Sequence, residues 1–511
     1  MATEYQATLR RIKAARANKM KWESHLRECY RYALPERNTI DKYEPGAKKN
    51  VDVFDSTAID ALEDYANRME TQLVPPTVNW MILESGTDIP EEESEEANKF
   101  LEDATDTLFN HIRSSNFSSQ IHETFLDLGV STGAIIVEDG DGIQSNLNFR
   151  AVSLSELVIE RSSRGIIDTV WRDITVQAGD ILKTWPRAKL TDTLKRIIED
   201  KPEEDVTLIE GVMEVKGGYE NMLIYEKENT FLFQEQLESS PWIVFRETTI
   251  PGESYGRGRV MRVLPDIKSL NLMVEDYLKA LNFQANPIWL GTDDGLVNPY
   301  TLRMKTNSVI PVGSNDSRNP SITQLPVSGN IQLLEFAIRG LQDVIRRALM
   351  SKPFGNIEET PVRTAAEMSM RNADHAQVSI GASGRIQSEL LERLIERCVF
   401  LLKRAGKIAD FKVDGKEVKI KFTSPAARQQ DEHQLANLLR FAETMAMFPP
   451  EVVQKRVKIE EFPAEIADVM GIPSRMMRTD FEVSEIEAQQ QQQQQQLEQQ
   501  ALAMQGGAGG R

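Results

Sequence analysis

The chain has 511 residues, of which 40% are hydrophobic and 27% charged, and its formal net charge at pH 7 is −18. This balance is that of a soluble globular protein, and the length predicts several packed regions rather than one core. The acidic charge argues against a protein that grips DNA tightly through basic surfaces, such as a repressor, but is compatible with a surface over which DNA slides.

The sequence gives no indication of a membrane segment or a disulfide. No apolar stretch approaches the roughly 18 to 20 residues needed to span a bilayer, and the first residues form a charged amphipathic pattern rather than a signal peptide. We therefore expect synthesis in the cytoplasm and no membrane partner. Cys29 and Cys398 lie far apart and match no metal-ligand spacing, so they are interpreted as buried thiols.

The first hundred residues alternate helical patterns and breakers. Apolar residues at helical spacing predict an amphipathic helix over 5–34, ended by Pro35, and a second helix over 55–74, stopped by a Pro-Pro pair. A short strand is predicted at 80–83. The acidic run inside 91–112 is interpreted as the dipole-compensating first turn of a helix rather than as a metal cluster.

The middle of the chain changes from strand to helix periodicity. Short alternating segments over 134–245 predict a β-rich region, and an apolar stripe over 267–281 predicts a helix with Pro265 in its first turn. The Gly- and Pro-rich stretch 286–327 predicts a small β-containing insert. A second amphipathic helix follows over 331–349, so the two helices should form a hairpin capped by the insert.

Breakers predict a loop over 351–361, after which a Thr-x-x-Glu capping box opens a long helix from Thr364 towards Leu402. A β-hairpin is expected around 414–415. Helices are expected from 428 onward, and the Gln- and Gly-rich end from 489 is low-complexity sequence.

One catalytic pattern is matched. Residues 129–133, GVSTG, fit the G-x-S-x-G elbow, but that elbow follows a strand, whereas here a helical run precedes it and a strand follows. A Gly-rich turn from helix to strand is the favoured interpretation, and a hydrolase using Ser131 remains an alternative. Gly256 and Gly258 begin a dinucleotide fingerprint, but Met261 occupies the place of its third glycine.

The sequence contains no phosphate-binding loop and no paired histidines at metal-ligand spacing. We expect no enzymatic activity, no metal and no cofactor.

Five segments, taken in order, are similar to portal proteins, the head-to-tail connectors of podovirus-type, short-tailed bacteriophages. They are DSTAIDALEDYANRMETQLVPPTVNW at 55–80, LGVSTGAIIVED at 128–139, ESYGRGRVMRVLPDIKSLNLM at 253–273, PVRTAAEMSMR at 361–371, and the glutamine-rich tail. The resemblance extends over nearly the whole chain and implies an α+β portal fold. Its regions would be a wing at 1–255 and 363–427, stem helices at 256–285 and 328–350, a β-containing clip at 286–327, a tunnel loop at 351–362, a helical crown at 428–488 and a low-complexity tail at 489–511.

The resemblance also implies a function and partners. The chain would form a ring, a homo-oligomer of about twelve copies, at the portal vertex of the virion. The ring would be the channel for packaging and ejecting double-stranded DNA. Its partners would be the terminase motor, the major capsid and scaffolding proteins, the tail adaptor and internal core proteins. A ring component of the tail with no DNA channel is the alternative.

Candidate residues follow from this architecture. Rings of Arg339, Arg346, Arg347, Lys352 and Asn356 would meet DNA, although surface arginines paired with acids such as Asp343 are an equally good interpretation. In the clip, the candidates for partner docking are Trp289, Asn298 and Tyr300, since aromatics anchor interfaces. The aromatics could instead form the small core of the insert.

Overall fold

The computed structural model describes residues 2–41, 46–86, 91–291, 314, 316, 318, 322–324, 331–351, 384–409, 411, 418–425, 440, 441, 443–445, 462 and 466, with the side chains of 91–96 left aside. The α-helices are α1 (Ala2–Ala33), α2 (Thr57–Leu73), α3 (Glu91–Arg113), α4 (Phe117–Val130), α5 (Ile181–Thr184), α6 (Asp192–Asp200), α7 (Arg259–Ala285), α8 (Ile331–Ala348) and α10 (Glu392–Arg404). Short 3₁₀ turns are η1 (Pro35–Arg37), η2 (Ala178–Asp180) and η3 (Glu226–Glu228), and η4 (Gln387–Leu391) is a π-helical turn.

The strands of the described residues form four antiparallel sheets. They are β1 (Met81–Ser85), β2 (Thr132–Asp139), β3 (Leu147–Ala151), β4 (Leu157–Arg161), β5 (Ile167–Gln177), β6 (Asp205–Val215), β7 (Gly218–Tyr225), β8 (Thr230–Leu237), β9 (Trp242–Arg246), β10 (Trp289–Gly291), β11 (Ile322–Gln324) and β12 (Val418–Phe422). The spatial orders are β4-β5-β6-β7-β8, β3-β2-β9, β1-β12 and β10-β11. The fold is thus α+β, as predicted, because its described strands pair antiparallel.

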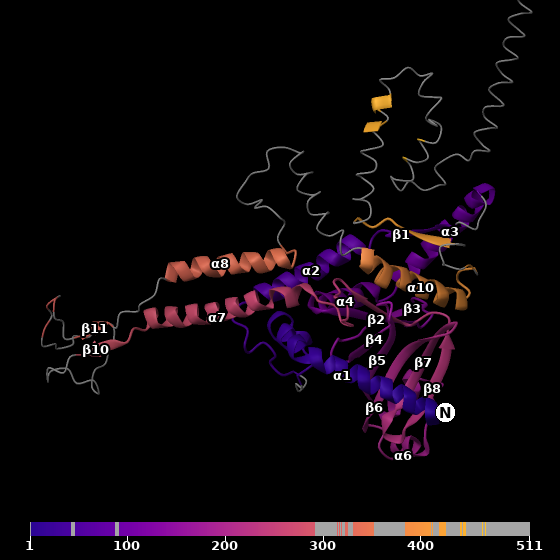
Figure 1. Ribbon diagram of the computed structural model, residues 1–511, viewed down its shortest axis with the longest axis horizontal. Coiled ribbons are helices and arrows are strands. Elements are labelled where there is room, and N and C mark those ends of the chain that lie inside the picture. Colours follow the sequence, from indigo (N-terminus) through magenta and orange to yellow (C-terminus); the bar gives the residue numbers. More distant parts are fainter. Residues whose placement is uncertain are drawn as a thin grey trace, which may run out of the picture.

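Helix α1 lies along the five-stranded sheet (Figure 1). Its buried Ile12 belongs to a small core that includes Trp171 and Ile224 of the sheet. At the polar margin of this contact, the Arg16 guanidinium pairs with Asp173 of β5, and its Nη1 lies 3.1 Å from Glu226 Oε2. A separate core beneath η2, α5 and α6 covers part of the same sheet.

The main core joins segments that are distant in sequence. It contains residues of α2, α4, β2, β9, α10 and the first turns of α7, including the fully buried Leu62, Phe125 and Phe245. Phe125 meets Phe245 edge-on with ring centroids 6.2 Å apart. Cys29 and Cys398 are buried and unbonded to each other, as predicted.

Helices α7 and α8 project from this body as a two-helix hairpin, with the β10–β11 ladder at its far end (Figure 1). Residues buried on α8 include Ile338 and Ile345, both members of the predicted apolar stripe. The two helices and a strand-containing insert between them are therefore confirmed.

Several other predictions are confirmed. The first helix ends before Pro35, the second begins at Thr57, the acidic run starts α3, and 132–246 carries eight strands of two sheets together with two short helices. The 129–133 segment is a turn from helix α4 to strand β2, as favoured.

The prediction that Pro265 lies in the first turn of its helix is wrong. Helix α7 begins at Arg259, and Pro265 lies inside it. An interior proline costs about 3 kcal/mol because it removes a backbone hydrogen bond. Burial of Val260, Leu264 and Ile267 around this segment offsets that cost.

Strand β12 pairs with β1, an antiparallel contact between residues more than 330 positions apart that the sequence did not suggest. The turn predicted at 414–415, the capping box at Thr364 and the tail from 489 lie outside the described residues, and so do nearly all of 428–488.

Among the described residues, none of the helices is both long and apolar enough to cross a membrane. Nor does the described part of the chain bring three or more His, Cys, Asp or Glu side chains into an arrangement that could hold a metal ion.

Candidate functional site

The candidate site is the α7–α8 hairpin and the joint that fixes it to the body. Helix α7 has 27 residues and α8 has 18, so α7 alone extends about 40 Å at 1.5 Å per residue. The first turns of α7 and the end of α8 join the main core, so the direction of the outer part of the hairpin depends on how this base is held.

A buried ion pair holds the base. Arg259, the first residue of α7, donates from Nε to Glu247 Oε1 at 2.7 Å, and its Nη2 lies 2.5 Å from the same oxygen. Its Nη1 donates to the carbonyl oxygen of Ala348, the last residue of α8, at 3.4 Å. One guanidinium therefore connects the start of α7, the end of α8 and a carboxylate of the body.

Tyr65 completes this cluster from helix α2. Its hydroxyl donates to Glu247 Oε2 at 3.1 Å, and the Arg259 guanidinium carbon lies 5.7 Å from its ring centroid. The side chain of Glu247 is only 3% exposed. Both its oxygens have donors, which is the condition for tolerating a buried carboxylate.

The pKa directions agree with a charged Arg259 and a neutral Tyr65. Burial alone would lower the pKa of Arg259, but the charge and hydrogen bonds of Glu247 outweigh it and raise the pKa overall. The pKa of Tyr65 is raised well above its usual value, mainly by burial and secondly by the negative charge of Glu247. The phenol therefore keeps its proton and remains a donor.

The Gly-Arg-Gly turn before α7 is the second part of the joint. A Cβ on Gly256 would lie 2.6 Å from the backbone oxygen of Ser131, and one on Gly258 would collide with the oxygen of Val130. These glycines let the turn approach the helix-to-strand turn at 129–133 backbone to backbone. The two motif-like patterns of the sequence are therefore the two sides of one contact.

Ser131 belongs to this contact. Its side chain is fully buried, and its Oγ donates to the carbonyl oxygen of Gly256 at 2.7 Å. In return, Gly256 N donates to Thr132 Oγ1 at 2.9 Å. A serine with its hydroxyl engaged and no solvent access does not have the exposed position of an elbow nucleophile.

Arg246, at the end of β9, forms a third link. Its Nη2 donates to Glu389 Oε1 at 2.7 Å, and its backbone N donates to Glu389 Oε2 at 3.0 Å. Glu389 lies in the π-helical turn η4, an insertion of the kind that often re-aims one side chain. This bond ties the segment after the hairpin to the strand that leads into it.

The three arginine candidates of α8 do not share one side of the helix. Arg339 and Arg346 are seven residues apart and lie on one flank of the helix, whereas Arg347 is turned about 80° from Arg339. The Arg339 side chain is 74% exposed and pairs with Glu335 at 2.6 Å. Arg347 Nε donates to the backbone oxygen of Asp343 at 3.2 Å. Lys352 and Asn356 lie outside the described residues.

Of the clip candidates, Trp289 lies in β10, pairs across the ladder with Gln324 and is 45% exposed. Its neighbours Ile288 and Leu290 are 50% and 47% exposed, so three consecutive apolar side chains face solvent at the tip. Asn298 and Tyr300 lie outside the described residues.

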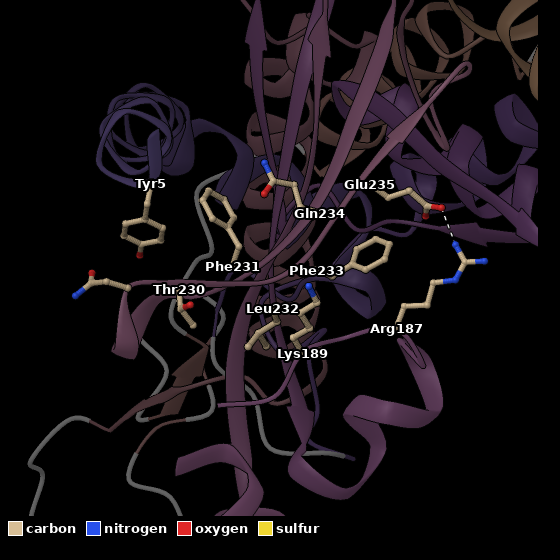
Figure 2. A pocket seen from close by; sticks show the side chains of 10 residues that line it. Tyr5, Arg187, Lys189, Thr230, Phe231, Leu232, Phe233, Gln234 and Glu235 are labelled. Atoms are coloured by element: carbon tan, nitrogen blue, oxygen red, sulfur yellow. Dashed lines mark hydrogen bonds and ion pairs between the residues drawn. The ribbon is translucent and has the colours of Figure 1, made fainter. Parts of the chain in front are cut away.

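A hollow of about 650 Å³ lies beside the edge strand β8 (Figure 2). This strand is at the end of the body away from the hairpin (Figure 1). Arg187 Nη1 pairs there with Glu235 Oε1 at 2.7 Å, and Lys189 N donates to the Leu232 oxygen. The backbone at Lys189 thus already covers part of the strand edge, and the carboxylate of the lining, Glu235, is engaged by Arg187.

Arg246, Glu247, Arg259 and Glu389 are the functional residues that the sequence did not reveal. The available signal was an arginine directly after a Gly-x-Gly turn and before a long helix. The identity of its partner depends on a contact with another segment, which spacing does not encode.

The described part of the chain is thus a body with one main core and a projecting two-helix hairpin whose base is held by a buried ion pair. The model of the family described as bacteriophage head to tail connecting protein matches residues 5–477, and the chain belongs to this family. It is also similar, at 9% identity and a TM-score of 0.40, to a chain of a solved structure titled "Virion of native gene transfer agent (GTA) particle"; 87% of this chain and 93% of that chain are covered. A search among curated proteins finds no match.

The family places the chain at the junction of head and tail in the bacteriophage virion. The sequence-based recognition of a head-to-tail connector is thereby confirmed.

We expect Arg259→Met to lower the free energy of unfolding by about 3 kcal/mol or more, because it leaves the carboxylate of Glu247 buried without its cation. Arg339→Met is the matched control, since it removes an exposed i,i+4 pair worth about 0.3–0.5 kcal/mol. Urea unfolding followed by circular dichroism measures both. Equal midpoints for the two variants would contradict the role of the joint.

Ser131→Ala should lower stability by about 1 kcal/mol through loss of the hydrogen bond to Gly256. Any esterase activity of the purified chain should be the same before and after this change. Activity that disappears with the hydroxyl, in a protein whose unfolding midpoint is intact, would instead support the hydrolase alternative.

Proposed function

We propose that copies of this chain close into a ring of about twelve at the portal vertex, and that double-stranded DNA passes through its channel during packaging and ejection. The observation that supports this most directly is the projecting hairpin. Its two helices are fixed at one base to a body that has its own core, so identical hairpins set side by side would build a cylinder.

Charge on the hairpin supports passage without sequence readout. Arg339 and Arg346 lie on one flank of α8, two turns apart, so each would form a ring of positive charge about 10 Å from the other. Repeated charges at one height present the same potential to DNA at any rotation. The net charge of −18 on each chain limits the total grip on phosphates.

The partners in this proposal are those that the resemblance to portal proteins implies. The tip of the hairpin, the clip at 286–327, would dock the terminase motor during packaging and the tail adaptor afterwards. The body would contact the major capsid and scaffolding proteins, and the crown at 428–488 the internal core proteins. The tunnel loop at 351–362, which carries Lys352 and Asn356, would extend the channel surface.

The competing function is a structural ring of the tail that has no DNA channel. This function is equally compatible with the connector family and with the hairpin. It gives the α8 arginines no role beyond pairing with acidic residues at the surface. The two proposals therefore differ in the effect of neutralising those arginines.

Arg339→Gln with Arg346→Gln should leave rings intact by negative-stain electron microscopy but lower the DNA packaged per head several-fold. The matched control is Lys183→Gln with Lys195→Gln, which neutralises two cations of the body and breaks their surface pairs with Asp180 and Asp192. Rings with normal packaging in the arginine variant would favour the tail-ring alternative. A monomeric wild-type chain at micromolar concentration would refute both.

Trp289→Ser tests the clip. If this side chain anchors a tail protein, its removal should weaken attachment by about 2 kcal/mol, roughly thirtyfold, with ring yield and thermal midpoint unchanged. Val51→Ser, an exposed apolar position on the body, is the control, and Asn298→Lys is a second probe of the clip. A fall in the thermal midpoint would show instead that Trp289 belongs to the core of the insert.

A further inference from the structure

We propose that the hairpin carries two different apolar stripes on opposite sides, and that the α8 stripe of one copy packs on the α7 stripe of the next. This inference rests on the proposed ring, and it specifies which surfaces close it. It is carried by the exposed faces of the two helices, which the packing of α7 on α8 leaves uncovered.

Helix α8 is apolar on a second face. Phe336 is 76% exposed and Val344 38% exposed, whereas Ile338 and Ile345 on the α7-facing side are 8% and 0% exposed. At about 100° per residue, Phe336 and Val344 lie within about 80° of each other. A phenylalanine three-quarters exposed on a helix otherwise patterned for burial marks a surface that another apolar surface covers.

Gly340 lies between these two residues on the same stripe. Glycine inside a helix is unfavourable relative to alanine, so its presence at this position calls for a structural explanation. Packing within the described part of the chain supplies none, because a Cβ added at Gly340 would meet no heavy atom of it within 4 Å. Ile338 and Ile345 are turned about 160° and 140° away from it. The missing side chain therefore points to close approach of a neighbouring helix along this stripe.

Helix α7 has the complementary stripe. Leu272 and Phe283 are 57% and 50% exposed and, eleven residues apart, lie within about 20° of each other around the helix. The buried Leu270 and Ile267 are turned about 160° and 140° from Leu272. Each helix of the hairpin therefore has an uncovered apolar face on the side away from its partner.

The two stripes match in height. Arg259 and Ala348 define the base, since they are hydrogen bonded to each other. Leu272 lies thirteen residues beyond Arg259, and Phe336 twelve residues before Ala348, which puts them about 20 and 18 Å above that base. A copy displaced sideways by one hairpin would bring its Phe336 level with Leu272 of its neighbour. No element from another protein is needed, and a single foreign partner would cover only one of the two faces.

Cysteine cross-linking tests this contact in the full-length chain. Leu272→Cys with Phe336→Cys, treated with a short bis-maleimide, should give a ladder of covalent oligomers in denaturing gels. Each single variant should stay monomeric, because a contact between two different surfaces never brings like residues together. The natural thiols give little background: both are buried, and burial raises the pKa of Cys29 and of Cys398 to about 12.

The control is Leu182→Cys with Phe336→Cys, which has the same number of new thiols but places one on an exposed leucine of α5. It should give no ladder. Dimers from Phe336→Cys alone would show a contact between like surfaces and would overturn the inference. Rings seen by microscopy without a ladder from the 272–336 pair would overturn it while leaving the proposed function standing. Absence of rings in the wild-type chain would refute the proposed function itself.

Gly340→Gln provides an independent test that does not weaken the monomer. It replaces an interior helical glycine by a good helix former in open space, so the fold should be retained and the dissociated subunit should unfold at the same or a higher temperature. The ring fraction in analytical ultracentrifugation should nevertheless fall several-fold. An unchanged ring fraction in the folded variant would contradict close helix approach at Gly340.

Discussion

The ion pair between Arg259 and Glu247 is the interaction on which the arrangement of the whole hairpin depends. Its carboxylate comes directly after β9, its guanidinium begins α7, and the same guanidinium reaches the last carbonyl of α8. The first turns of α7 and the end of α8 join the main core, and this pair fixes the point at which both helices leave it. A buried pair of this kind is a poor source of stability compared with apolar packing, but it is directional, and it leaves no satisfactory alternative partner for either charge.

The backbone contact between the turns at 129–133 and 256–258 works together with this pair. A close approach of two main chains requires glycine, and a buried hydroxyl requires an acceptor; Gly258 and Ser131 meet these two needs on facing sides. Each segment, taken alone, looks like a fragment of a catalytic or nucleotide-binding motif. Such resemblance arises because tight turns use the same small residues whatever the turn is for.

The elements with strong periodicity were predictable from the sequence. The apolar stripe of α8 and the alternating residues of 134–245 repeat their signal over several turns or strands, and the structure contains both. The start of α7 was not predictable, because Pro265 is a helix-start signal and only tertiary burial of residues before it allows the helix to begin earlier. The pairing of β1 with β12 and of Arg246 with Glu389 also depends on contacts across the chain, for which one sequence holds no local signal.

Mechanically, the hairpin is a cantilever. A sideways load on the β10–β11 ladder acts on the base of the hairpin through an arm of about 40 Å. A small force at the tip therefore produces a large turning moment at the base. Pro265 lies six residues above the joint and lacks one backbone hydrogen bond at that level. The residues around Pro265 are buried in the main core, which supports this weakened turn. Bending under load should therefore concentrate in the exposed outer half of α7, which would spare the ion pair below it.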